Sequence, residues 1–277
     1  MYQSAVLETI DERKRDPWSV ILEPCRYDLD FMIWTLACPR RLGGNPMKTA
    51  ILLVPALLLS TAVTSLLADE PSGQRVAVDA APAQRLLAAG RQMISDFKVT
   101  HYSHKTLIDR EHGICEVDCS GFLVALLKQT SLDHLRQIAT RHKQPLAKDF
   151  YQTFAPDDGE VPRGWKQIER MQDVEPGDII AWIKLERAPG DNTGHVLLVE
   201  EKPMADSPDQ FRVRVLDSTA HGHGHDSRPE GKSGIGRGTI WLDVDDDGQP
   251  VAFRWKSRNG RPHEVPIAIG RAVALRK

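Results

Sequence analysis

The sequence predicts an α+β domain in which helices pack on an antiparallel β-sheet. Two observations support this fold class. Apolar residues recur at helical spacing in several segments between residues 82 and 154. From residue 176 onward the pattern changes to short apolar or alternating runs separated by Gly, Pro, Asp and Asn, which are typical of strands and turns. Helices followed by strands, rather than alternating with them, are typical of α+β domains.

Four helices are expected. The first covers "PAQRLLAAGRQMISDFKV", which starts at residue 82, and the second begins at Cys119. Two further helices are expected over Leu132–Arg141 and Ala147–Phe154. The segment "THYSHKTLIDREHG", residues 100–113, has no clear period and is expected to be a loop.

Six strands are expected after the helices. Their sequences are "PGDIIAWIKL", "GHVLLVEEK", "FRVRVLDST", "GTIWLDV", "PVAFRW" and "IAIGRAVAL". The segment "DVDDDG", residues 243–248, resembles the opening of a calcium loop. Arg254 stands where such a loop has its bidentate glutamate, so we expect a hairpin turn here.

The N-terminal region carries a targeting pattern. Residues 47–68, "MKTAILLVPALLLSTAVTSLLA", combine a basic start with an apolar run, as in a secretory signal peptide; a retained membrane anchor is the alternative. Residues 1–46 would precede that signal, which indicates a mis-assigned start, with an unusual leader as the alternative. We therefore expect a linker at 69–82, a folded domain at 83–277, and a periplasmic or secreted protein.

The composition predicts a globular protein and bears on which classes of partner to expect. The chain of 277 residues has 36 basic and 38 acidic side chains and is 41% hydrophobic, which is enough to bury a core. The formal charge of -2 gives no reason to expect nucleic acid as a partner, and a membrane is expected only through an uncleaved signal segment. After the signal only Cys115 and Cys119 remain. A disulfide between them would close too short a loop to stabilise much, so Cys119 needs another explanation.

Cys119 stands where a helix is expected to begin. Unpaired amides and the positive end of the helix dipole favour a thiolate there, and a thiolate is the nucleophilic form. Ser120 and Gly121 are small, so a carbonyl group can approach the sulfur. The backbone amide of Cys119 is available to stabilise an oxyanion. A buried structural cysteine is the alternative, but the adjacent Asp118 is a poor neighbour for an apolar core.

A nucleophilic thiol needs an imidazole, and that imidazole needs an orienting group. His195 opens a predicted strand. If this strand pairs antiparallel with "FRVRVLDST", the registers 195/217, 197/215 and 199/213 place His195 and Asp217 opposite each other on one face. The sequence thus predicts a Cys119, His195, Asp217 site. The alternative for His195 is a hydrogen-bonded core histidine.

The ordered set "DCSGF", "PGD" and "GHV" resembles the NlpC-type cell-wall cysteine peptidases, which belong to a papain-like superfamily, over roughly residues 100–220. This resemblance implies a papain-like fold and hydrolysis of amide bonds in peptidoglycan stem peptides without a cofactor. It implies that Cys119 is the nucleophile, His195 the general base and acid, and Asp217 the orienting residue. It also implies that Tyr102 donates a hydroxyl to the oxyanion, and that Asp118 and Ser120 bind the amine and carboxylate of the substrate.

The segment "DSTAHGHGHDSRP" contains His221, His223 and His225 at alternating positions. Such residues can gather on a strand face as a metal site, but the glycines leave them without a rigid frame. We therefore expect no metal and a loop that borders the cleft, with His221 or Arg228 contacting substrate.

Two other functions stay open at this point. The same Cys and His residues also suit an amidase or acyltransferase, and a catalytically idle binding module is a third possibility. The expected partner is a peptidoglycan stem peptide or a related small peptide, bound by a monomer.

Overall fold

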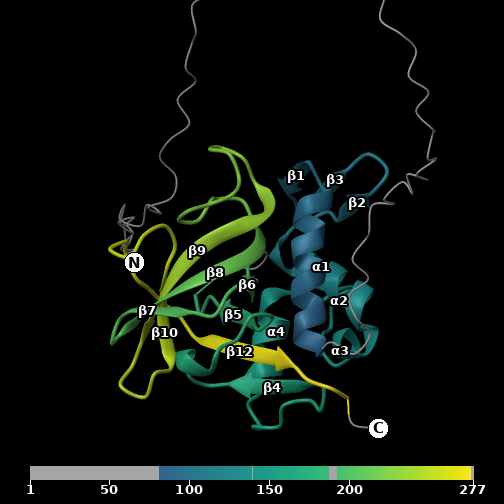
Figure 1. Ribbon diagram of the computed structural model, residues 1–277. Helices are drawn as coiled ribbons and strands as arrows, with labels where there is room; N and C mark the ends of the chain where they lie inside the picture. The colour runs from purple at the N-terminus through teal and green to yellow at the C-terminus, as the bar shows by residue number, and fades with distance from the viewer. Residues whose placement is uncertain (1–80, 139, 187–191, 276–277) are drawn as a thin grey trace, which may run out of the picture. The chain divides into compact units, whose positions relative to one another are not determined.

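The computed structural model describes residues 81–138, 140–186 and 192–275 (Figure 1). The predicted leader at 1–46, the signal peptide at 47–68 and the linker up to residue 80 lie outside the described residues. Within the described ranges, no helix has both the length and the apolar character needed to span a bilayer.

The four predicted helices are present. They are α1 (Pro82–Asp96), α2 (Cys119–Thr130), α3 (Leu132–Arg136) and α4 (Ala147–Phe154). Helix α1 has Pro82 in its first turn, where the missing N–H group of proline costs nothing. Helix α3 ends five residues before the predicted Arg141, because the amides of Gln137 and Ile138 bond to carbonyls three residues back and close a tight turn.

A nine-stranded antiparallel sheet forms the larger part of the fold, which confirms the predicted α+β class. Its strands are β4 (Trp165–Ile168), β5 (Ile179–Ile183), β6 (Gly194–Val199), β7 (Met204–Ser207), β8 (Gln210–Thr219), β9 (Gly234–Val244), β10 (Pro250–Arg254), β11 (His263–Glu264) and β12 (Ile267–Ala272). The spatial order is β11-β10-β9-β8-β6-β5-β12-β4, with β7 paired to β8. The expected turn at 243–248 joins β9 to β10 as an antiparallel hairpin.

The segment at 100–113 was expected to be a loop, and this expectation was wrong. It belongs to a small second sheet formed by β1 (Val99–Tyr102), β2 (Leu107–Asp109) and β3 (Ile114–Val117), in the order β1-β3-β2. Strand β1 runs parallel to β3. These strands have three or four residues each and are largely half-exposed, so the sequence shows no apolar period over them.

Two apolar clusters lie on opposite faces of the large sheet. Alternate residues of one strand belong to different clusters: Leu198 of β6 packs with the helices, whereas Leu197 and Val199 pack in the second cluster. Helices α1, α2 and α4 contact β6 and its neighbours on the first face (Figure 1). Strand β10 approaches β12, so the sheet curls around the second cluster. Both faces of the central strands are therefore buried.

Gly194 fixes the point at which β6 begins. Its φ angle is +147°, a region that favours glycine, and a Cβ atom built there would lie 1.9 Å from the carbonyl oxygen of Trp182. The Asn192 side chain accepts a hydrogen bond from the Gly194 amide at 2.9 Å. Because His195 follows directly, the close approach of β5 and β6 at this glycine sets the position of the imidazole.

We predict that Gly194→Ala destabilises the fold by about 3 kcal/mol or more, because the added methyl group meets backbone rather than a movable side chain. Gly159→Ala is the matched control, since Gly159 has a φ of +75° but open space around its Cβ position. The control should cost only about 1 kcal/mol, the price of the unfavourable φ. Urea unfolding of both variants measures the difference, and equal costs would contradict the clash.

Candidate active site

Cys119 is the first residue of α2, and Asp118 caps that helix. The Asp118 Oδ1 atom accepts hydrogen bonds from the Gly121 amide at 2.6 Å and from the Ser120 hydroxyl at 2.9 Å. Asp118 thus uses one carboxylate oxygen to satisfy an unpaired amide of the first turn. Cys115 and Cys119 are both free. The prediction that Cys119 stands at a helix N-terminus is therefore confirmed.

The two thiols differ in their surroundings. Cys115 lies in β3 and is fully buried, and burial raises its pKa to about 12, so it stays protonated at neutral pH. Cys119 is 4% exposed and interacts with both Tyr102 and His195 through its side chain. Only Cys119 has an imidazole as a partner among the described residues.

His195 links the thiol to Asp217. Its Nε2 atom lies 2.6 Å from the Asp217 Oδ2 atom. Burial by itself lowers the pKa of His195, but the negative charge at Cys119 and the hydrogen bonds to Asp217 and Cys119 outweigh it and raise the pKa from 6.5 to about 9. Because Asp217 holds Nε2, the Nδ1 atom is the one left to exchange a proton with the sulfur.

The predicted register of the two strands was wrong by two residues. Leu198 lies opposite Leu216 and Val199 opposite Val215, whereas we expected Val199 opposite Val213. Strand β7 explains the shift, because it pairs with the first residues of β8, with Met204 opposite Arg212, and β6 pairs with the residues further along. A shift of two residues keeps every side chain on its face, so His195 and Asp217 still meet, as diagonal neighbours.

Asp217 is fully buried and receives three side-chain donors. Besides His195, the His223 Nε2 atom lies 2.8 Å from Oδ2, and the Arg228 Nη2 atom lies 2.6 Å from Oδ1. Burial raises the pKa of this carboxyl group, but His223, His195 and Arg228 together hold it well below its ordinary value. Asp217 is therefore a carboxylate, and both imidazoles present an N–H group to it.

Strand β8 is also hydrogen-bonded to β3, the strand that leads to Cys119. The Ser218 hydroxyl donates a hydrogen bond of 2.6 Å to the carbonyl oxygen of Val117, two residues before Cys119. The Ser233 hydroxyl, on the segment before β9, accepts a hydrogen bond of 3.2 Å from the Tyr102 amide. The small sheet that leads into α2 is thus fastened to the strand that carries Asp217.

His223 is the residue that sequence reasoning missed. The three histidines of the loop do not act together: His221 and His225 are exposed, whereas the His223 side chain is fully buried. The glycines around it were interpreted as a sign of flexibility. Gly224 instead permits a close approach, because a Cβ atom there would lie 2.6 Å from the carbonyl oxygen of Lys256. Local sequence held no signal that selects His223, because glycines on both sides of a histidine are equally typical of a flexible loop.

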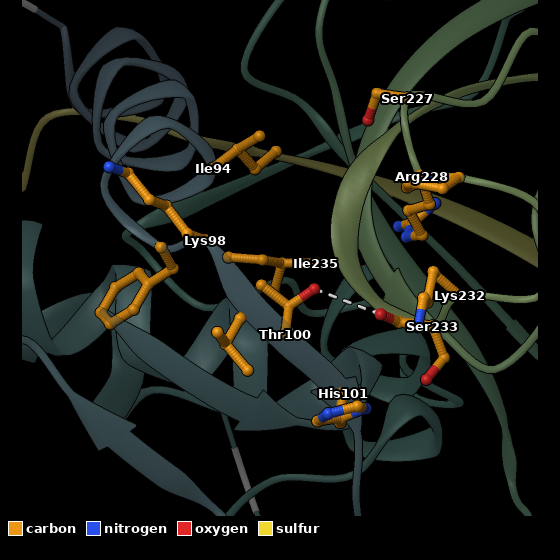
Figure 2. Close-up of a pocket in the computed structure, with 12 residues that line it drawn as sticks. Ile94, Lys98, Thr100, His101, Ser227, Arg228, Lys232, Ser233 and Ile235 are labelled. Atoms are coloured by element: carbon orange, nitrogen blue, oxygen red, sulfur yellow. Dashed lines mark hydrogen bonds between the residues drawn. The ribbon is translucent and has the colours of Figure 1, made fainter. Parts of the chain in front are cut away.

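Arg228 does not present its guanidinium to a substrate. Its Nε donates to the Gly234 carbonyl at 2.7 Å, Nη1 to Asp226 at 2.7 Å, and Nη2 to Asp217. The residue lines a cavity of about 390 Å³ (Figure 2), with Arg228, Lys232 and Ser233 on one side and Ile94 and Lys98 on the other. The described residues that line this cavity include neither Cys119 nor His195. Arg228 is therefore a support of Asp217.

Of the other predicted substrate-binding residues, Tyr102, Asp118 and Ser120 lie around the thiol. Tyr102 interacts with Cys119, and burial, followed by the charges of Cys119, Asp118 and Asp217, raises its pKa, so that it stays a hydroxyl donor. The Asp118 Oδ2 atom lies 3.3 Å from the Nδ1 atom of the exposed His104. The His221 side chain is exposed, and its backbone carbonyl oxygen accepts a hydrogen bond from the Trp255 indole at 3.2 Å.

The His195, Asp217 and His223 side chains are close enough together to be considered as metal ligands, since their ligand atoms all lie within 4.8 Å of one another. Tetrahedral zinc, with bonds of about 2.0–2.2 Å, separates its ligands by about 3.3 Å. The N···O distances of 2.6 and 2.8 Å are hydrogen-bond lengths instead, and the Arg228 cation lies against the same carboxylate. The arrangement fits proton sharing better than metal binding.

We predict that His195 remains an imidazolium up to about pH 9, because the Cys119 charge raises its pKa. Below that pH the ring carries two protons, and it loses one as the pH rises past it. Replacing the thiol by Cys119→Ala removes the charge and should lower the pKa of His195. A ¹⁵N NMR titration of the imidazole nitrogens in both proteins measures this, and identical titration curves would contradict the Cys119 to His195 interaction.

Comparison with known proteins gives a family but no activity. No protein-family model matches the chain, and no solved structure matches it. A protein of Acanthamoeba polyphaga mimivirus, named "Uncharacterized protein R653", is 34% identical over 178 residues, which cover 56% of this chain and 76% of the viral protein. With that identity over three quarters of the viral protein, the chain belongs to the same family as mimivirus protein R653.

Proposed function

We propose that this protein is an exported thiol hydrolase of papain-like fold that cleaves amide bonds in peptidoglycan stem peptides. The observation that carries the proposal is the position of His195 between the Cys119 thiol and the buried Asp217 carboxylate. A packing role alone does not require a histidine that interacts with both groups. The set of nucleophile, base and orienting acid is the one that acyl transfer uses.

The first half of the reaction follows from the placement of the protons. With Nε2–H directed at Asp217, the Nδ1 atom of His195 already holds the proton of the Cys119 thiol before the reaction, so the starting state is a thiolate and imidazolium pair. The thiolate attacks the carbonyl carbon of the substrate amide and forms a C–S bond. The Nδ1–H group then protonates the leaving amine as the C–N bond breaks, which leaves a thioester on Cys119.

The second half returns the enzyme to its starting state. Nδ1 takes a proton from water, the resulting hydroxide attacks the thioester carbonyl, and the C–S bond breaks to give the acid and the thiolate. In both halves the oxyanion is stabilised by the amide of Cys119, at the start of α2, and by the Tyr102 hydroxyl, which lies beside the sulfur. Asp217 does not take the proton; it orients the ring and stabilises the imidazolium.

The papain-like assignment is supported by the layout of these groups. The nucleophile stands at the N-terminus of a helix, and the histidine and aspartate stand on adjacent strands of the antiparallel sheet against which that helix packs. The motifs "DCSGF", "PGD" and "GHV" fall at the start of α2, the start of β5 and the start of β6. Peptidoglycan as substrate, and a periplasmic or secreted location, are supported by the NlpC-type motif order and the signal-like segment at 47–68.

We expect Cys119→Ala to be inactive and folded. Asp217→Asn should lower kcat by about a hundredfold or more, because an amide must direct its NH₂ group at either Arg228 or the two imidazoles, all of which are donors. Asp246→Asn, in the exposed turn between β9 and β10, is the control for loss of a carboxylate. Thermal unfolding identifies any variant that does not fold. Full turnover by folded Asp217→Asn would contradict the orienting role.

The substrate is tested with purified muropeptides. Mass spectrometry of the products should show a gain of one water per cleaved stem peptide, and Cys119→Ala should leave the peptides intact. Added free amines separate hydrolysis from the alternative acyltransferase reaction, since an acyltransferase would yield amine adducts in place of the acid. If muropeptides stay intact under all conditions, peptidoglycan is not the substrate.

A further inference from the structure

We propose that His223 is a positioning residue of this site. Together with Arg228 it fixes the Asp217 carboxylate so that His195 stays directed at Cys119. This inference rests on the proposed function, and it assigns the site a second imidazole that the three-residue pattern of nucleophile, base and acid does not contain.

The contacts of Asp217 divide between its two oxygens. Arg228 holds one end of the residue, because its Nη2 atom contacts both Oδ1 at 2.6 Å and the Asp217 carbonyl oxygen at 2.8 Å. The two imidazoles share Oδ2, at 2.6 Å for His195 and 2.8 Å for His223. Opposing donors on both oxygens leave the carboxylate one orientation. His223 is the donor that holds Oδ2 in place while His195 exchanges its proton with the sulfur.

His223 is itself held rigidly. Its amide donates to the Asp226 Oδ2 atom at 2.7 Å, and the same carboxylate accepts hydrogen bonds from the Arg228 amide and guanidinium at 2.7 Å each. Its ring packs 4.1 Å from the Trp255 ring, between centroids, and so close to Gly238 that a Cβ atom there would lie 2.6 Å from it. The segment 223–228 is therefore a single clamp that carries both supporting donors of Asp217.

Packing alone does not explain a histidine here. The His223 Nδ1 atom is buried and has no hydrogen-bond partner in the described structure. An unsatisfied buried nitrogen costs about 1–3 kcal/mol, a cost that an apolar side chain of the same size would avoid. The contact from Nε2 to Asp217 offsets that cost. The side chain is thus suited to donating one hydrogen bond to one carboxylate.

The consequence of removal follows from the groups that face His195. These are Cys119 from α2, Asp217 from β8 and His223 from the loop, with the rings of Trp182 and Trp255 beside them. Without His223, Oδ2 keeps a single donor and the carboxylate can turn about its Cβ–Cγ bond. His195 then loses its fixed direction, and the thiolate and imidazolium pair is stabilised less. Cys119 should therefore react as an ordinary thiol.

The experiment measures alkylation of Cys119 by iodoacetamide in the full chain, at pH 6 and pH 10, with mass spectrometry to locate the label. At pH 6 a free thiol is mostly protonated, so fast alkylation reports the ion pair; at pH 10 thiols ionise without help. His223→Leu should lower the rate at pH 6 by about tenfold or more and leave the rate at pH 10 nearly unchanged, because only the support of the ion pair is lost.

Two further variants make the comparison specific. His223→Gln places an amide N–H close to the position of the imidazole Nε2, so it should keep the pH 6 rate within about threefold of the unchanged protein. His225→Asn is the control in the same loop, since His225 is exposed and its φ of +45° suits asparagine. If His223→Leu does not fold, His223→Asn replaces it, because its shorter amide falls short of Asp217.

The proposal is overturned if folded His223→Leu is alkylated at pH 6 as fast as the unchanged protein, or if its rate falls equally at both pH values, as general damage to the site would cause. Alkylation needs no substrate, so the outcome is separate from the proposed function. A protein that leaves muropeptides intact but shows the expected alkylation pattern would keep His223 as a positioning residue and lose only the substrate assignment.

Discussion

The arrangement of this domain around its thiol depends on one buried negative charge, the carboxylate of Asp217. Moving an ionised carboxylate out of water costs several kcal/mol, so such a group persists only with a counter-charge and hydrogen bonds on its oxygens. Arg228 supplies the charge, and His195 and His223 supply the remaining donors. Three separate segments, β6, the 223–228 loop and β8, are thereby held at one point.

The rest of the fold brings the Cys119 thiol to that point. Ser218 follows Asp217 and bonds to the strand that leads into α2, and Ser233 bonds to the strand that carries Tyr102. These two hydrogen bonds join the small sheet to the large sheet beside the Cys119, His195 and Asp217 side chains. On the other side, the aromatic rings of Trp182 and Trp255 pack against His195. A low dielectric around the imidazole strengthens its interactions with both charged neighbours.

The loop after β8 was expected to border the cleft, but part of it packs inward against Asp217. We expected His221 or Arg228 to contact substrate, but Arg228 and the neighbouring His223 direct their polar groups inward at Asp217. The exposed His221 and His225 lie outside this network. The exposed histidines and the enclosed one are therefore different residues of one short segment.

The sequence by itself determined the helices, the main strands and the position of Cys119 at a helix N-terminus. The start of α2 at Cys119, the bounds of α4 and the main strands followed from local period and turn residues, because these patterns depend on neighbours along the chain. The meeting of His195 and Asp217 on one face followed too, although the assumed register was off by two residues, since the face depends only on odd or even spacing.

Only the tertiary structure decided the small sheet, strand β7 and the partners of Asp217. Strands of three or four residues carry too few positions to show a period, and β7 altered the register of β8 without any signal in β6. The choice of His223 among three histidines, and the inward direction of Arg228, depend on contacts with Trp255, Gly238 and Gly234, which lie up to 32 residues away in the chain. Such contacts arise from packing between different segments of the chain. Local sequence therefore does not determine which of the three histidines is buried.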